Sequence, residues 1–524
     1  MSDFRPLGGK AETIRSRQIG DVVIQAGANT LASGEIEVRL EPLVMDLLSM
    51  LAEQPNSVVS RDALLETLWH KRHGADESLT RAVSSLRKSF RILNTSSVSI
   101  ETVPKRGYKL VVSESVISPD KEEPTPEELA IAGLPIVTIS AFETIGEQSL
   151  PDIGPEIAQG LSRFSWLRTR MSDTLKPDSR FHLVGSQHVR SGKLNLIIRL
   201  FDRKSDTVAW SRRFETGLDA ERDPLDAIEE LAGIVTASLA DPHGRLMAAN
   251  FAEFAQSKSR TMSGRDAVVR TFLFKERLSA EDHLETRNFL DRARAAEPHD
   301  ADIWAASAYI TIEEYKHDFN PLPDSRDRAL SMARRAVDLD QRNSYAQFCL
   351  AEVHYFRREY RAFKSVAERA IELNPYDSDA IAMIGIMMFY GGDRDRGVEL
   401  TLSAMRLNPD HPGWYRFAHI YNDVVEGNLD RALDWAERVK MPGYYADPYV
   451  RAQVLGLMGK TDEARRAADE MLALWGDDLA TFYDKAIARW VYRSPALVGK
   501  IVAGLEAAGI VLPDNPRLNA VRER

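Results

Sequence analysis

One segment, residues 76–91, combines a side that can be buried with a side suited to nucleic-acid contacts. Its apolar residues recur at helical spacing and predict an amphipathic helix; they are Leu79, Ala82, Val83, Leu86 and Phe90. The opposite side carries cations and small hydroxyl groups, namely Thr80, Arg81, Ser84, Arg87, Lys88 and Arg91. Long cations contact phosphates or guanine edges, and short side chains allow close approach. The segment therefore predicts a helix that lies in the major groove of duplex DNA.

A basic hairpin is predicted directly after this helix. The stretch VSIETVPKRGYKLVV (98–112) gives two strands of alternating character, and Lys105 and Arg106 lie at the tip between them. Gly107 is expected to supply conformational freedom for the turn. Because the minor groove has a negative potential that attracts arginine, such a tip is suited to the groove next to the helix.

The charge of the chain is polarised in a way that its average hides. The formal net charge of −10 would by itself oppose a nucleic-acid partner. Residues 1–113, however, hold 15 basic and 13 acidic residues, a net +2, while the remainder holds 53 basic and 65 acidic residues, a net −12. From charge alone, the basic surface around residues 71–109 fits a phosphate-facing surface and an ordinary solvated face equally well.

The segments before the basic helix supply the elements that would position it. Residues 19–40 alternate between short apolar runs and turns, which predicts a small antiparallel sheet. A helix is expected to begin near Pro42, with an apolar side made of Leu43, Leu47, Leu48 and Leu51. Ser60 is suited to cap a second helix, whose inward residues are Leu64, Leu65 and Leu68, with Trp69 beside them. A sheet, three helices and a hairpin in this order predict a winged helix-turn-helix over residues 18–113.

The rest of the chain predicts a multidomain, mainly α-helical protein. After an N-terminal tail (1–17) and the winged helix, residues 114–132 are acidic and proline-rich, as in a linker. Strand and helix patterns alternate over 133–242, which predicts a small α/β domain, and 243–262 would connect it to helices over 263–524.

A 34-residue period marks the helical region. Pro375 and Pro409 lie 34 residues apart, and Gln341 lies another 34 before them. This is the tetratricopeptide period, and about five units of an α-solenoid are expected, with Ala351 and Gly385 where paired helices approach closely. Such an array binds a protein or peptide partner or associates with itself, or else it acts only as a spacer.

The strings LEPLVMDLLSMLAEQPNSVVSRDALLETLW, LTRAVSSLRKSF and TVPKRGYKL resemble the OmpR-type winged-helix domain, most closely the CadC and HilA group of transcription activators. The resemblance implies sequence-specific binding of double-stranded promoter DNA through the third helix and the wing. It also implies an RNA polymerase contact through the loop with His70, Lys71, Arg72 and His73. We add Arg61 and Tyr108 to the predicted DNA-contact residues. His70 and His73 could otherwise suggest a metal site, but no further His or Cys cluster supports one.

Two further resemblances concern regulation. With about 18 residues ahead of the winged helix, no phosphoacceptor domain is expected, and the layout resembles the HilA-like activators, in which helical repeats follow the DNA-binding part. The stretches IRLFD (198–202) and WSRRF (210–214) resemble a TolB-like α/β domain, for which we expect an effector-sensing or packing role.

The chemistry of the chain narrows its function class. No GxSxG, HExxH or GxxxxGK[ST] motif occurs, so we expect neither an enzyme nor a cofactor. The single Cys349 permits no intramolecular disulfide, and the apolar run 380–390 is too short to span a membrane, which favours the cytoplasm. We expect a transcription regulator, an activator, controlled through its α/β and repeat domains by an effector or partner. The alternative is a tetratricopeptide adaptor whose basic domain docks an acidic protein.

Overall fold

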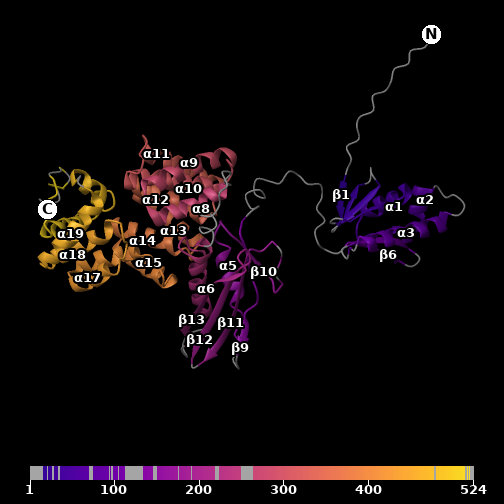
Figure 1. Cartoon of the computed structure of the whole chain (residues 1–524), viewed down its shortest axis with the longest axis horizontal. Helices are drawn as coiled ribbons and strands as arrows, with labels where there is room; N and C mark the ends of the chain where they lie inside the picture. Colours follow the sequence, from indigo (N-terminus) through magenta and orange to yellow (C-terminus); the bar gives the residue numbers. More distant parts are fainter. Residues whose placement is uncertain are drawn as a thin grey trace, which may run out of the picture. The chain divides into compact units, whose positions relative to one another are not determined.

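The computed structural model divides the chain into two compact units, Met1–Thr125 and Pro126–Arg524, which are described separately (Figure 1). The residues that the structure describes are 16–19, 22–25, 29–33, 36–69, 75–93, 95, 98–103, 106–112, 134–145, 150–174, 176, 178–190, 192–218, 224–248, 264–476, 479–513, 516 and 518–519. The predicted linker lies outside these residues.

The first unit begins with the predicted antiparallel sheet. Strands β1 (Ser16–Ile19), β2 (Val22–Gln25), β3 (Thr30–Ser33) and β4 (Ile36–Arg39) pair in chain order. Three helices follow, α1 (Pro42–Glu53), α2 (Arg61–Trp69) and α3 (Ala75–Ile92). A second sheet has the order β5-β7-β6, formed by β5 (Val58–Ser60), β6 (Val98–Val103) and β7 (Gly107–Val112). The winged helix-turn-helix prediction is therefore confirmed.

The core of this unit lies between the helices and the two sheets. The predicted apolar side of α3 is buried, and no residue of it is more than 6% exposed. Leu47, Leu48 and Leu51 of α1 are fully buried, but the prediction for Leu43 is wrong, because Leu43 is 38% exposed. The first turn of α1 buries Val44 and Met45 instead, since these residues share the side of Leu48 and Leu51.

The second unit opens with the predicted α/β layer. Strands β8 (Ile136–Ile139), β9 (Glu143–Ile145), β10 (Arg168–Met171), β11 (Phe181–Arg190), β12 (Lys193–Asp202) and β13 (Thr207–Gly217) form one sheet. Its order is β10-β8-β11-β12-β13, with β9 beside β11; β8 is parallel to β10 and β11, and β11 to β13 are antiparallel. Helices α5 (Gly154–Leu161) and α6 (Pro224–Ala240) contact each other and the sheet.

The helical repeats follow as six pairs among the described residues. The pairs are α8 (Gly264–Arg277) with α9 (Ala280–Ala296), α10 (Ala301–His317) with α11 (Ser325–Leu339), α12 (Ser344–Phe356) with α13 (Tyr360–Leu373), α14 (Ser378–Tyr390) with α15 (Arg394–Leu407), α16 (Phe417–Glu426) with α17 (Leu429–Glu437), and α18 (Ala446–Leu457) with α19 (Thr461–Trp475). The turns η2 (Gly413–Arg416) and η3 (Leu479–Thr481), a π-helix η4 (Tyr483–Ala488) and α20 (Pro495–Ala507) complete the unit.

The 34-residue period has a local cause in helix capping and close packing. Asn343 and Asp377, 34 residues apart, each accept a hydrogen bond from the backbone N–H three residues on, which fixes the start of α12 and α14. At Gly385, a Cβ atom would lie 3.0 Å from the carbonyl oxygen of Gly397 in the paired helix. The tetratricopeptide-like pairing and the close approach at Gly385 are therefore confirmed.

The α/β layer packs directly against the repeats. At Gly233 of α6, a Cβ atom would lie 3.3 Å from the side chains of Tyr376 and Leu407. Next to α6, Asp241 accepts hydrogen bonds from the backbone N–H of Asp379 at 3.1 Å and from the hydroxyl of Ser378. The two parts of the second unit thus share a buried polar joint.

His243 belongs to the same joint. Its ring contacts Glu276 through Nδ1 and Asp379 through Nε2 at 3.1 Å. Burial alone lowers the pKa of His243, but the hydrogen bonds to these two carboxylates raise it to about 10. The joint therefore contains a charged imidazolium at neutral pH.

A late segment, residues 483–493, crosses the first helices of three repeat pairs. Arg489 donates to the backbone oxygen of Tyr315 at the end of α10, and Tyr355 of α12 donates to the backbone oxygen of Trp490. Arg493 donates to the backbone oxygen of Gly391, just after α14, at 2.9 Å. The chain itself therefore occupies part of the surface of these first helices. Among the described helices, none combines the length and apolarity that a bilayer span requires.

Candidate nucleic-acid interface

Helix α3 presents a polar side because its apolar side is held in the core of the first unit. Thr80, Arg81, Ser84, Lys88 and Arg91 are all exposed, whereas Arg87 is half-buried. The exposed set spans three turns of one helix and mixes cations with short hydroxyl side chains. This is the surface that the sequence predicts for the major groove.

The start of α2 ties the helices to the wing. Ser60 accepts a hydrogen bond from the backbone N–H of Ala63 at 3.1 Å, which is the predicted capping geometry. Arg61 follows, and its guanidinium donates to the hydroxyl of Tyr108 in β7 at 2.9 Å and to the hydroxyl of Thr80 in α3 at 3.3 Å. Arg61 therefore connects three elements of the interface.

Arg87 holds α3 against strand β6. Its Nε and one terminal nitrogen donate to the backbone oxygen of Ile100 at 3.0 and 2.9 Å, and the same terminal nitrogen donates to the hydroxyl of Thr102 at 2.8 Å. A guanidinium used in this way has a fixed orientation. Arg87, one of the six polar residues predicted on the helix, therefore joins the helix to the wing strand.

The wing has a second structural reason for its glycine, besides the predicted conformational freedom. Gly107 pairs with Ser60 of β5, its φ is +148°, and a Cβ atom there would lie 2.0 Å from the backbone oxygen of Val59. Close approach of β5, in addition to backbone freedom, requires the glycine. Arg106 is exposed beside it, while Tyr108 is only 5% exposed. Lys109 pairs with Glu101 across the hairpin at 2.8 Å, so part of the basic charge of this region is neutralised locally.

Several predicted residues fall outside the part of the chain that the structure describes. These are Lys105 of the wing and the loop residues His70, Lys71, Arg72 and His73. Their predicted contacts with DNA and with RNA polymerase stay predictions. Within the described residues, no group of His, Cys, Asp and Glu side chains has a metal-binding arrangement.

Sequence reasoning missed two features that shape this interface. Strand β5 is only three residues long and, among the described strands, pairs with β7. Asn56, with φ +62°, uses its side-chain amide to donate to the backbone oxygen of Val112 at 3.1 Å and to accept from its N–H at 3.0 Å. An asparagine in the PNS turn before a β-branched pair was the available indication, because asparagine tolerates this backbone conformation.

This chain resembles a known protein family and several known proteins. Residues 35–110 match the family model described as "Transcriptional regulatory protein, C terminal". The transcriptional activator CadC of Escherichia coli (strain K12) is 35% identical over 96 residues, which cover 18% of this chain and 19% of CadC. The cholera toxin homolog transcriptional activator of Vibrio parahaemolyticus is 36% identical over 139 residues, 25% of this chain and 48% of that protein.

A third relative is matched over most of its length. The transcriptional regulator HilA of Salmonella typhimurium is 20% identical over 476 residues, which cover 86% of this chain and 81% of HilA. By contrast, the matches with CadC and the Vibrio activator span about a fifth and about half of those proteins. Residues 35–110 of this chain are therefore an OmpR-type winged-helix domain, with CadC, HilA and the Vibrio activator as its homologues.

Proposed function

We propose that the chain is a sequence-specific, DNA-binding transcription regulator that activates promoters. The observation that carries this proposal is the exposed basic side of α3, presented by a winged-helix domain of the transcriptional regulatory family. A helix with cations and small hydroxyls on its exposed side is suited to the major groove. The relatives named above are transcription regulators and activators, which supports this class over an enzyme or an adaptor.

The proposed roles of the residues follow from their contacts. Thr80, Arg81, Ser84, Lys88 and Arg91 contact the major groove and the neighbouring phosphates, because all five are exposed on one helix. Arg106 and Lys105 contact the adjacent minor groove. Arg61, Arg87 and Tyr108 position these groups, since the first two bridge elements of the domain and Tyr108 is buried.

Regulation is proposed to come from the second unit. The α/β layer and the repeats are joined by buried polar contacts, so binding of an effector or a partner protein to either part can alter the other. RNA polymerase is the proposed partner of the loop His70 to His73, by resemblance to the OmpR-type domain. Control by aspartyl phosphorylation is not part of this proposal.

Selection of bound sequences from a random duplex pool tests the proposal without a known promoter. The full chain should enrich one motif, and Arg81→Ala should weaken binding to that motif by about 1–3 kcal/mol more than binding to random duplex, if Arg81 makes a bidentate base contact. Arg466→Ala, an exposed arginine of α19, is the matched control and should change neither affinity. Failure to enrich any motif over random DNA would refute the proposal and favour the adaptor alternative.

A further inference from the structure

The second unit contains a partly open cavity that the proposed DNA-binding function does not use. Its volume is about 150 Å³. Its lining comes from the first helices of five successive pairs (α8, α10, α12, α14 and α16), from α18, α20 and the segments 441–446 and 486–491, and from His243 and Trp414. The cavity therefore lies where the late segment 483–493 crosses the repeats. A change there would affect contacts between distant parts of the array.

One end of the cavity is polar, and its charges are mutually compensated. Lys275 donates to Asp379 at 2.8 Å. Lys316 donates to Glu352 at 2.8 Å and to Glu313. His243 also lines this end and contacts Glu276 and Asp379, so each of these three cations already has a carboxylate partner.

One acceptor at this end has no partner among the described residues. Glu352 is fully buried and lines the cavity, and its Oε1 accepts the bond from Lys316, while its Oε2 has no hydrogen-bond partner there. A buried polar atom without a hydrogen bond is costly, so a group that bonds to it would be stabilised. Burial raises the pKa of Glu352, and the ion pair with Lys316 opposes this change. In its ionised form Oε2 can only accept, and the polar end then calls for an N–H or O–H group.

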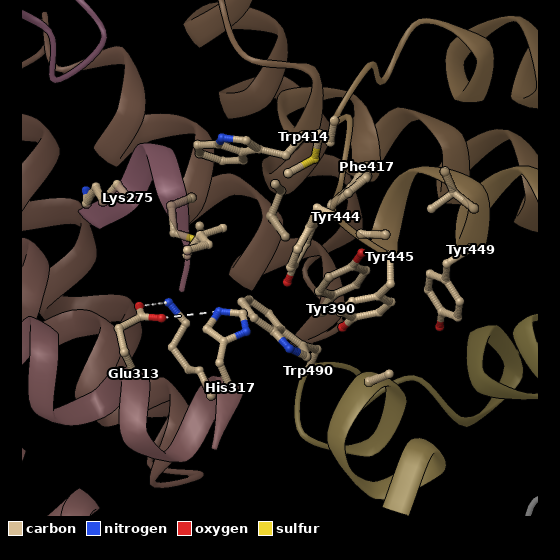
Figure 2. A pocket seen from close by; sticks show the side chains of 18 of the residues that line it. Lys275, Glu313, His317, Tyr390, Trp414, Phe417, Tyr444, Tyr445, Tyr449 and Trp490 are labelled. Carbon is tan, nitrogen blue, oxygen red and sulfur yellow. Dashed lines mark hydrogen bonds and ion pairs between the residues drawn. The ribbon is translucent and has the colours of Figure 1, made fainter. Parts of the chain in front are cut away.

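The other end is aromatic. Figure 2 shows ring side chains gathered opposite Glu313 and His317, with Trp490 between the two ends; the rings are Tyr390, Trp414, Phe417, Tyr444, Tyr445 and Tyr449. Neighbouring rings already meet at angles typical of aromatic contacts, as for Tyr444 and Tyr445, whose centroids are 4.9 Å apart. A planar ring inserted here gains edge and face contacts of the same kind.

From these observations we propose that the cavity binds a small, uncharged aromatic molecule that carries one N–H or O–H group. A volume of about 150 Å³ matches one or two rings, since cavities of this size hold benzene. The ring lies among the tyrosines, and the donor bonds to Oε2 of Glu352. A purely apolar ring would leave Oε2 unbonded, and a carboxylate on the ring would bring an acceptor oxygen to Oε2, which is itself an acceptor.

The site is proposed as the effector site of the regulator, and only that assignment rests on the proposed function. The ligand would bridge the late segment and the first helices of the repeats, and so stabilise their closed arrangement. Binding of the ligand and binding of DNA are measured separately, so failure of one does not imply failure of the other.

Isothermal titration calorimetry of the full chain tests the site with four probes. Phenol and indole should bind at one site with Kd on the order of 10⁻⁵–10⁻³ M. Toluene, which has no hydrogen-bond donor, should bind at least about tenfold more weakly than phenol. Benzoate should give no saturable heat. No saturable binding of phenol and indole, as expected of a cavity that holds only water, would overturn the proposal. Toluene binding as tightly as phenol would overturn the assigned role of Glu352.

Cavity-filling variants locate the binding. Ala486→Leu and Ala446→Leu each add a larger side chain at a buried lining position and should weaken phenol binding at least tenfold. Ala503→Leu, at an exposed position of α20, is the matched control and should leave the affinity unchanged. Unchanged phenol affinity in both filled variants, with thermal unfolding showing that they are folded, would place the binding elsewhere and refute the site. The probe series on the unaltered chain is decisive by itself if a filled variant does not fold.

Discussion

Substitution of Arg87 tests whether this residue contacts DNA itself or positions other residues that do. Arg87→Ala removes three hydrogen bonds from a charged donor, two to the backbone oxygen of Ile100 and one to the hydroxyl of Thr102. Each such bond contributes about 1.5–3 kcal/mol at most, and Arg87 is only half-buried, so we expect a loss of about 1–3 kcal/mol in the free energy of unfolding of the first unit. Urea unfolding of residues 1–125 measures it.

The DNA-binding consequence of the same change is also specific. The slope of log Kd against log salt concentration reports the number of neutralised phosphates, at about 0.9 per contact. If Arg87 positions the wing, Arg87→Ala weakens binding without changing this slope. Lys88→Ala, which removes an exposed cation from the next position, should lower the slope by about 0.9 and leave stability almost unchanged.

Arg87→Lys completes the test, because lysine keeps the charge but cannot form the fork of hydrogen bonds. We expect Arg87→Lys to lose nearly as much stability and DNA affinity as Arg87→Ala. Fluorescence anisotropy titrations of a labelled duplex at several salt concentrations provide the affinities and slopes. A lysine variant with full affinity, together with a lower slope for the alanine variant, would show that Arg87 contacts a phosphate and would refute the positioning role.

Two other predictions concern the wing and the polar joint. Gly107→Ala should destabilise residues 1–125 by at least about 2 kcal/mol in urea unfolding, because its Cβ would displace β5 at Val59; a smaller loss would contradict the close approach. Because the pKa of His243 is raised to about 10 in the folded chain, the stability it contributes is complete below its unfolded pKa of about 6.5 and is lost as pH rises towards 10. From pH 6.5 to 9 the full chain should lose about 3 kcal/mol relative to His243→Gln, and parallel pH profiles of the two proteins in urea unfolding would refute the role of Glu276 and Asp379.

Elements with a long apolar pattern could be predicted from the sequence, and short or paired ones could not. The stripe of α3 repeats over about three turns, so its helical side and its buried residues follow from periodicity alone. Strand β5 depends on its pairing with β7, in which Val59 lies opposite Tyr108, 49 residues further along the chain. A strand of three residues is too short to show a periodic pattern of its own. Leu43 was misassigned because its apolar character says nothing about which way the first turn of α1 faces.

The DNA-binding interface could be predicted from the sequence in part, and the cavity could not. The cations of α3 lie on one helix, so their common side was predictable from spacing. Whether a cation is exposed or bonded to its own domain, as Arg87 is, depends on strand β6, which meets the helix only after folding. The cavity was not predicted, because Lys316 and Glu352 meet across helices of two different repeats. The sequence indicates the cavity only through the charged residues that lie inside the apolar helices α10 and α12.

The contacts of residues 483–493 also set an order of events during protein synthesis. Trp490 bonds to Tyr355 over 135 residues of chain, and Arg489 bonds to Tyr315 over 174. The early repeats can form their local helix pairs as they leave the ribosome, but they cannot complete their packing until this late segment has been made. Until then the faces of α10 and α12 that later contact Trp490 are uncovered, and a nascent chain at this stage is a predicted substrate for chaperones.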